Sequence, residues 1–251
     1  MQTFESDIIY GIHPVEELLR TRPESIHRLY FAQQTRSGEL FALMKQCRKD
    51  RIPYQLVPAG KLTALAASTK HQGIVAQCGL KQFADAERIL ADLHESATPG
   101  LLLIPASIED PRNLGAIIRS AVAFGVSAVF MERKHCVHLG ATVAKTSAGM
   151  LEHIAVARPR SLEAVLKECK KMGYQIIGAL PGASLRPRDI DFTNPTVLVI
   201  GGEHRGIPPY LRALCTDFVS IPTASKVQSL NAAAAASILL YECGRQRADT
   251  T

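Results

Sequence analysis

The apolar residues in the first third of the chain follow two different spacings. Apolar positions three and four residues apart indicate helices, and short apolar runs indicate strands. This pattern predicts helices at 13–20, 37–50 and 58–68, alternating with strands at 27–32, 53–57 and 73–78. A polar stretch follows, with one weak helical segment at 84–93, and it closes with Thr98, Pro99 and Gly100. We therefore expect a small α/β domain over 1–78 and a linker over 79–98.

From Leu101 onward the apolar runs become continuous. Strands are expected at LLLI (101–104), SAVFM (127–131), YQIIGAL (174–180), TVLVI (196–200) and DFVSI (217–221). Helices are expected between them at 114–124, 161–172 and 229–242, with Ser161 as N-cap and Gly173 just beyond the end of the second. Strands without polar alternation are buried on both faces, which is typical of a parallel sheet covered by helices. Residues 99–251 are therefore predicted to form a second, larger α/β domain.

Composition narrows the class of protein. Of the 251 residues, 47% are apolar and 21% are charged, as in ordinary globular proteins. No apolar run is long enough for a membrane span, and the first residues lack the layout of a signal peptide. The six cysteines form no CxxC pair, which favours free thiols in a reducing compartment over a disulfide framework or a zinc site. A cytoplasmic protein is expected.

The charge of the chain permits a nucleic-acid partner without requiring one. The formal net charge is +6, and the basic residues are spread along the chain instead of being gathered in a tail. Tryptophan is absent and aromatic residues make up 6%, so recognition through rows of stacked bases is not expected.

Three loops carry the candidate chemistry, because ligands of parallel sheets bind beyond the carboxyl ends of the strands. The first loop holds Asn113 and Arg119, the second is GGEHRGIPP (201–209), and the third is PTASKVQSLN (222–231). Each has a purely structural alternative. Asn113 could cap the helix that follows it, and Ser229 could cap a later helix with Asn231 in its first turn. The glycines could turn the chain, and Glu203 could be a solvated acid. Neither a GxGxxG nor a Walker motif is present.

Together, these loops resemble the three motifs of the SpoU/TrmH family of RNA ribose 2′-O-methyltransferases, within the SPOUT superfamily. The resemblance rests on NxGAxxR at 113–119, GxExxGI at 201–207, and IP…SLN at 221–231, in that order. The segment KTSAGMLEHIAVAR (145–158) also resembles the family. In the first domain, IIYGIHPVEELL and KHQGIVAQ resemble the ribosomal-protein-like RNA-binding domain that precedes some members.

This resemblance implies a fold, a cofactor and an assembly. It implies an α/β domain with a mostly parallel sheet and a trefoil knot near its C-terminal end, although knots are rare in general. It implies that S-adenosylmethionine is held largely by backbone groups, at positions carried over to Gly201, Ile221 and Leu230. It also implies a homodimer through the catalytic domain whose active sites are completed by the partner subunit. No metal is needed.

The implied reaction suits the residue types. Methylating a ribose hydroxyl requires positioning and removal of a proton. Arg119 is expected to stabilise charge and hold phosphate, since a guanidinium group is a poor base. Asn113 and Asn231 can orient ribose and backbone, Glu203 can hold Arg119 or Asn113, and Ser229 can donate a hydrogen bond. The base is left open. Ser225 replaces a family glycine, so the backbone there is expected to differ.

Several alternatives remain open. His135, Cys136 and His138 could suggest a metal site, but no further ligand pair has useful spacing, and a surface loop is favoured. A non-catalytic RNA-binding ribosome-assembly protein with the same fold is the main rival, followed by a nucleotide-dependent oxidoreductase or ligase. For an enzyme, the first domain favours large-subunit (23S) rRNA over tRNA as substrate, by analogy alone.

Overall fold

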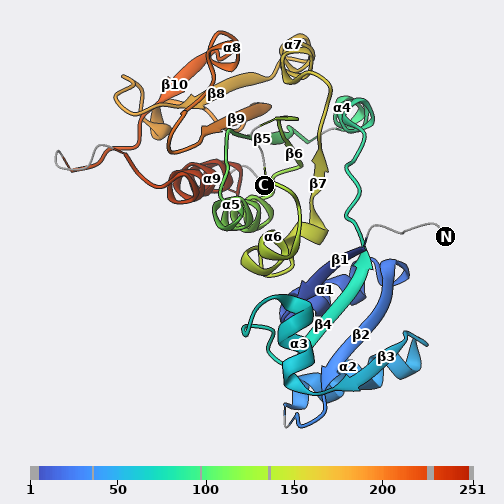
Figure 1. Cartoon of the computed structure of the whole chain (residues 1–251). Helices are drawn as coiled ribbons and strands as arrows, with labels where there is room; N and C mark the ends of the chain where they lie inside the picture. The colour runs from blue at the N-terminus through green and yellow to red at the C-terminus, as the bar shows by residue number, and fades with distance from the viewer. Residues whose placement is uncertain (1–5, 36, 97, 135–136, 225–228, 249–251) are drawn as a thin grey trace. The chain divides into compact units, whose positions relative to one another are not determined.

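The computed structural model describes residues 6–35, 37–96, 98–134, 137–224 and 229–248. Its chain forms two compact units (Figure 1). The first unit comprises Met1–Gln82 together with His138–His153, and the second comprises Phe83–Val137 and Ile154–Thr251. Segment 138–153 thus groups with the first unit, whereas the pattern of the sequence placed it within 99–251. The predicted domain bounds remain a prediction.

The first unit is built on a four-stranded sheet in the order β1-β4-β2-β3. Its central strands pair antiparallel, and β2 and β3 pair parallel. The strands are β1 (Ser6–Tyr10), β2 (Ile26–Ala32), β3 (Tyr54–Val57) and β4 (Ile74–Gly79). The helices are α1 (Ile12–Thr21), α2 (Gly38–Lys49), α3 (Ala59–Ala66) and α6 (Ala141–Thr146), with short 3₁₀ turns η1 (Pro23–Ser25) and η2 (Met150–His153).

Ion pairs attach η2 to the rest of the first unit. Glu152 is almost fully buried, and its carboxylate lies 2.7 Å from Nε of Arg22 and 3.7 Å from Nζ of Lys81. Burial lowers the pKa of Lys81, while the charge of Glu152 acts against that shift. One residue along, His153 contacts the carboxylate of Glu17 at 2.6 Å. These contacts, together with α6 against β1, are why segment 138–153 belongs to this unit.

The second unit contains a six-stranded sheet in the order β10-β8-β9-β5-β6-β7, with every neighbouring pair parallel. The strands are β5 (Leu101–Ala106), β6 (Ala128–Phe130), β7 (Ala155–Ala157), β8 (Gln175–Ala179), β9 (Thr196–Gly201) and β10 (Asp217–Val219). The predicted α/β class with a parallel sheet is therefore confirmed, and so is each of the five strands expected after Leu101.

Helices cover both faces of this sheet (Figure 1). The elements are α4 (Ala86–Glu95), α5 (Pro111–Ala123), α7 (Leu162–Lys171), η3 (Pro187–Asp189), α8 (Pro209–Arg212) and α9 (Ala232–Ala248). Side chains of α4, α7 and α8 pack with alternate residues of the strands in one core. Helices α5 and α9 lie side by side against the other face. Two covered faces explain why β5 and β9 are buried along almost their entire length.

Local signals at α7 are confirmed in detail. The Ser161 hydroxyl accepts a hydrogen bond from the backbone N–H of Ala164, and Gly173 follows the helix with φ +83°. The elements that the sequence pattern missed are mostly three to six residues long: β1, β7, α6 and α8. Among the described residues, no helix is both long and apolar enough to cross a membrane.

Removing Glu152 should destabilise the first unit. In Glu152→Ala the partly buried cations of Arg22 and Lys81 would lose their carboxylate, and breaking such a pair lowers the free energy of unfolding by about 3 kcal/mol. Urea unfolding followed by circular dichroism measures the change. Glu163 is a matched control, because it pairs with Lys167 at 2.6 Å on the exposed surface of α7. Glu163→Ala should cost at most about 0.5 kcal/mol. Equal losses for the two variants would contradict the structural role given to Glu152.

Candidate functional site

A cavity of about 360 Å³ opens at the carboxyl ends of β8, β9 and β10. Its walls are mostly apolar side chains and backbone from the loops that follow these strands. The predicted cofactor residues Gly201, Ile221 and Leu230 all line it, and so do Glu203 and Ser229. Sequence positions far apart in the chain therefore meet at one place, at the end of the sheet where ligands of parallel sheets bind.

Two glycines let the loops around this cavity approach each other backbone to backbone. A Cβ at Gly201 would collide with the backbone of Gly206 and Ile207, and a Cβ at Gly202 would collide with the carbonyl of Ser107. The N–H of Gly202 donates to the carbonyl of Ala106 at 2.8 Å, which continues the pairing of β9 with β5. These contacts require glycine at both positions, so the glycines do more than turn the chain.

Asn113, Glu203 and Asn231 form one hydrogen-bonded cluster. The amide nitrogens of Asn113 and Asn231 donate to the same oxygen, Oε1 of Glu203, at 2.5 and 3.0 Å. Nδ2 of Asn231 also lies 3.1 Å from Oδ1 of Asn113. A carboxylate that accepts several N–H donors is held in a single orientation. Glu203 is therefore not a freely solvated loop acid.

Asn231 has a second role at the start of α9. Its Oδ1 accepts hydrogen bonds from the backbone N–H groups of Ala233 and Ala234, so Asn231 caps the helix. The N–H of Ala232 points at Oε1 of Glu203 from 3.4 Å. The positive end of the α9 dipole thus faces the carboxylate. Asn113, by contrast, is not a cap, because the side chain of Asp110 caps α5.

The remaining predicted residues take separate positions. Ser229 is exposed and lines the cavity. Arg119 is exposed on α5, lies outside the cavity lining, and makes no hydrogen bond or ion pair among the described residues. Glu203 therefore contacts Asn113 and not Arg119.

Ser225 lies outside the described residues, as do His135 and Cys136, and the described part of the chain holds no group of three metal-binding side chains.

Glu132, which the sequence pattern did not indicate, connects the loop after β5 to α8. It follows β6, and its Oε2 accepts hydrogen bonds from the backbone N–H and the hydroxyl of Ser107, at 2.6 and 3.3 Å. Its Oε1 accepts from the hydroxyl of Tyr210 at 2.7 Å. Burial raises the pKa of Tyr210, and the bond to this carboxylate raises it further. Ser107 itself has φ +54°, an uncommon conformation that places its carbonyl against Gly202. The sequence signal that could have identified Glu132 is an acidic residue directly after a predicted buried strand.

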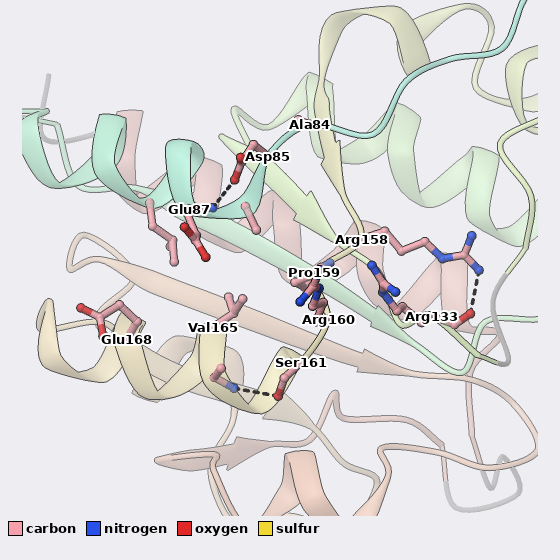
Figure 2. A pocket seen from close by; sticks show the side chains of 13 residues that line it. Ala84, Asp85, Glu87, Arg133, Arg158, Pro159, Arg160, Ser161, Val165 and Glu168 are labelled. Carbon is pink, nitrogen blue, oxygen red and sulfur yellow. Dashed lines mark hydrogen bonds between the residues drawn. The ribbon is translucent and has the colours of Figure 1, made fainter.

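A second, larger cavity of about 740 Å³ lies between α4 and α7 (Figure 2). None of the residues that the sequence predicted for the site lines it. The residues predicted from the three loops, apart from Arg119, therefore lie at the smaller cavity or in the cluster of Asn113, Glu203 and Asn231.

Comparison with protein families covers most of the chain. Residues 100–241 match the SpoU rRNA Methylase family, and residues 8–84 match the family described as RNA 2′-O ribose methyltransferase substrate binding. A Bacillus subtilis protein assigned to the TrmH family of tRNA/rRNA methyltransferases, YacO, is 34% identical over 97% of both chains. An uncharacterised tRNA/rRNA methyltransferase of Mycolicibacterium gilvum is 36% identical over 98% of this chain and 78% of its own length.

Solved structures agree with these matches. The SpoU methyltransferase AviRb from Streptomyces viridochromogenes superposes with a TM-score of 0.80 at 25% identity, over 98% of this chain and 91% of that one. Its complex with the cofactor S-adenosylmethionine (AdoMet) superposes with a TM-score of 0.78 at 26% identity, over 97% and 91% of the two chains. The cofactor expected from the sequence is thus the one bound in a structure of the same fold.

Two substitutions of Asn231 should separate its capping role from its role in the cluster. Asn231→Ala removes the cap of α9 and should lower the free energy of unfolding by about 1 kcal/mol or more. Asn231→Ser keeps an oxygen that can cap the helix, so most of that stability should return, although the donor to Glu203 is lost in both variants. Urea unfolding of the two proteins beside the unaltered one measures this. Equal destabilisation by both would mean that capping is not what Asn231 contributes to stability.

Proposed function

This chain belongs to the SpoU rRNA methylase family, and we propose that it is an AdoMet-dependent methyltransferase acting on the ribose 2′-hydroxyl of RNA. The resemblance seen in the three loops is confirmed by the family matches. The observation that carries the proposal is the cluster of Asn113, Glu203 and Asn231 beside a cavity lined by Gly201, Ile221 and Leu230. It joins all three motifs in one site.

The cavity has the properties that AdoMet requires. Its volume of about 360 Å³ falls in the usual range for small-molecule pockets, roughly 300–1,000 Å³. Leu180, Ile207 and Leu230 supply apolar walls for a purine and an aliphatic chain, and Glu203 supplies negative charge for a sulfonium. Because Gly201 leaves no room for a side chain, its backbone borders the cavity. When bound, the cofactor supplies an electrophilic methyl group.

The cluster is suited to orienting the ribose. Asn113 and Asn231 are held through Glu203, so their remaining polar atoms have defined directions for hydroxyl and phosphate oxygens. Oε1 of Glu203 takes the donors of the cluster, and no described residue donates to Oε2. That oxygen is free to accept a hydrogen bond from a substrate hydroxyl. Ser229, on the cavity wall, adds a hydroxyl that can donate to the substrate.

We infer that Arg119 acts at the site of a partner subunit in a homodimer. Six residues of helix separate it from Asn113, which turns its side chain by about 240° around α5 and carries it about 9 Å along the axis. The adjacent Ser120 is hydrogen bonded to Ser237 of α9 at 2.7 Å. Near this contact, α9 exposes Ile238 and Tyr241, at 42% and 56% of their surface. Exposed apolar side chains on paired helices favour a symmetric contact between two copies.

We propose large-subunit (23S) rRNA as the substrate. The match of residues 8–84 to a substrate-binding family supports an RNA partner for the first unit, and the methylase family itself is described by its action on rRNA. Relatives are described as tRNA/rRNA methyltransferases, which makes tRNA the alternative. We also propose that the second unit contains the trefoil knot that the family resemblance implies.

Product analysis tests the reaction and the substrate together. The purified protein, labelled AdoMet, and either protein-free ribosomal RNA or bulk tRNA are incubated, and the RNA is digested to nucleosides. We expect label in a 2′-O-methylated nucleoside from the ribosomal RNA. Label on a base would refute ribose methylation, label in tRNA alone would refute the rRNA assignment, and cofactor binding without transfer would favour a non-catalytic RNA-binding role.

Arg119→Ala should abolish methyl transfer and leave AdoMet affinity nearly unchanged, because Arg119 lies outside the cavity lining. Single-turnover methylation and calorimetric titration with AdoMet measure the two effects. Arg188→Ala, a change at another exposed arginine of the second unit, is the matched control and should leave both unchanged.

Mixing two inactive variants tests where Arg119 acts. If each site combines Arg119 of one subunit with Asn113 of the other, hybrids of Arg119→Ala and Asn113→Ala contain one intact site. Random exchange of subunits then restores about a quarter of full activity. The absence of any recovery, with subunit exchange verified by mass, would place Arg119 in the site of its own chain.

A further inference from the structure

The cavity between α4 and α7 lies beyond the ends of strands β6 and β7. Three arginines contribute to its lining: Arg133 follows β6, and Arg158 and Arg160 follow β7. Figure 2 shows them at the end of the cavity near Pro159 and Ser161, with the carboxylate of Glu168 at the opposite end. Asp85 and Glu87 line the side of the cavity that α4 forms.

Arg158 serves as the structural support of this group. Its guanidinium donates to the backbone carbonyls of Glu132 and Arg133, at 3.3 and 2.7 Å, and lies over the ring of Phe83 at 5.4 Å. These bonds tie the loop after β6 to the loop after β7. Arg133 and Arg160 therefore stand on two loops that are fixed to each other.

Arg133 and Arg160 are exposed, and neither forms an ion pair among the described residues. Of the three acids that line the cavity, Asp85 caps α4 through the N–H groups of Glu87 and Arg88, and Glu168 pairs with Lys171 at 2.7 Å. The third, Glu87, is exposed on α4 and forms no ion pair with either arginine. Two guanidinium groups on fixed loops, without carboxylate partners, suit an anion with several oxygens, since guanidinium binds phosphate oxygens in pairs.

The position of this group relates it to the catalytic loops. Strand β7 lies two places from β5 in the sheet, about 10 Å at the usual spacing of neighbouring strands. Because all the strands are parallel, the arginines share the carboxyl edge of the sheet with the loops of Asn113 and Glu203. Glu132, adjacent to Arg133, holds Ser107 of the loop after β5. A polymer with its target ribose at the catalytic cluster would carry neighbouring phosphates along this edge.

We propose that Arg133 and Arg160 bind the phosphodiester backbone of the substrate RNA next to the methylated nucleotide, with Arg158 holding their loops in place. The proposal rests on the RNA methyltransferase function and adds a phosphate-binding site on the second unit, separate from the substrate-binding match at 8–84. The site reads no sequence, because contacts to phosphate position an RNA without distinguishing its bases.

The test is RNA binding as a function of salt. A labelled 20-nucleotide single-stranded RNA is titrated with the full-length double variant Arg133→Ala/Arg160→Ala at several salt concentrations. Two lost phosphate contacts should reduce the slope of log affinity against log salt by about 1.4, and weaken binding about ten- to thirty-fold at 0.1 M salt. The matched control is Lys170→Ala/Lys171→Ala, which removes the same charge from the opposite end of α7. A third variant, Arg133→Lys/Arg160→Lys, should restore most of the slope.

The outcomes separate the site from the proposed function. AdoMet affinity and the unfolding curve should match those of the unaltered protein in all three variants. A salt slope in Arg133→Ala/Arg160→Ala equal to that of the lysine control would overturn the site, even if the unaltered protein methylates ribose. Failure of the unaltered protein to methylate any RNA would instead refute the proposed function, whatever the binding data show.

Discussion

The Glu203 carboxylate is the contact on which the site depends. Its Oε1 accepts from Asn113, which is 90 residues away in the chain, and from Asn231, which is 28 residues away. Loops that follow different strands have no local reason to meet, so a shared acceptor must align them. Because this acceptor also faces the first N–H of α9, the start of the last helix is aligned with the end of β9. A charged acceptor holds these donors more strongly than a neutral one would.

Glu203 can reach both amides only because the backbones beneath it are in close contact. Gly202 packs against the carbonyl of Ser107, and Ser107 is held in a left-handed conformation by Glu132. Strain at one residue is tolerated where surrounding bonds over-determine it. The two carboxylates therefore have different roles. Glu132 fixes the backbone of the loop that contacts Gly202, and Glu203 aligns the side chains of Asn113 and Asn231.

The fold could be predicted from the sequence further than the site could. Continuous apolar runs such as TVLVI identified the strands because both faces of the sheet are covered, and Ser161 and Gly173 marked the limits of α7 because caps act locally. Strand β7 was missed, whereas β6 and β10, which also have three residues, were found because the longer runs SAVFM and DFVSI contain them. The partners of Glu132 and Glu152 could not be predicted for another reason: Ser107 and Arg22 are 25 and 130 residues away from them, and no spacing rule encodes such distances. For Arg119, the motif identified the residue, but it did not show that the residue lies outside the lining of the cavity in the same chain.

The two kinds of contact around the site also differ in what they demand of the sequence. The cavity depends on the positions of main-chain atoms, so Gly201 and Gly202 are required for the absence of a side chain, while apolar wall positions such as Ile221 need only suitable size and shape. The cluster depends on side-chain atoms with defined donors and acceptors, so Asn113 and Asn231 have few substitutes.

Asn231 is the most constrained, since one amide group must cap α9 with its oxygen and bind Glu203 with its nitrogen. Aspartate would keep the cap but set a second carboxylate against Glu203, and serine would keep the cap but shorten the reach. Only an amide of this length satisfies both neighbours at once, which is the physical reason for asparagine at that position.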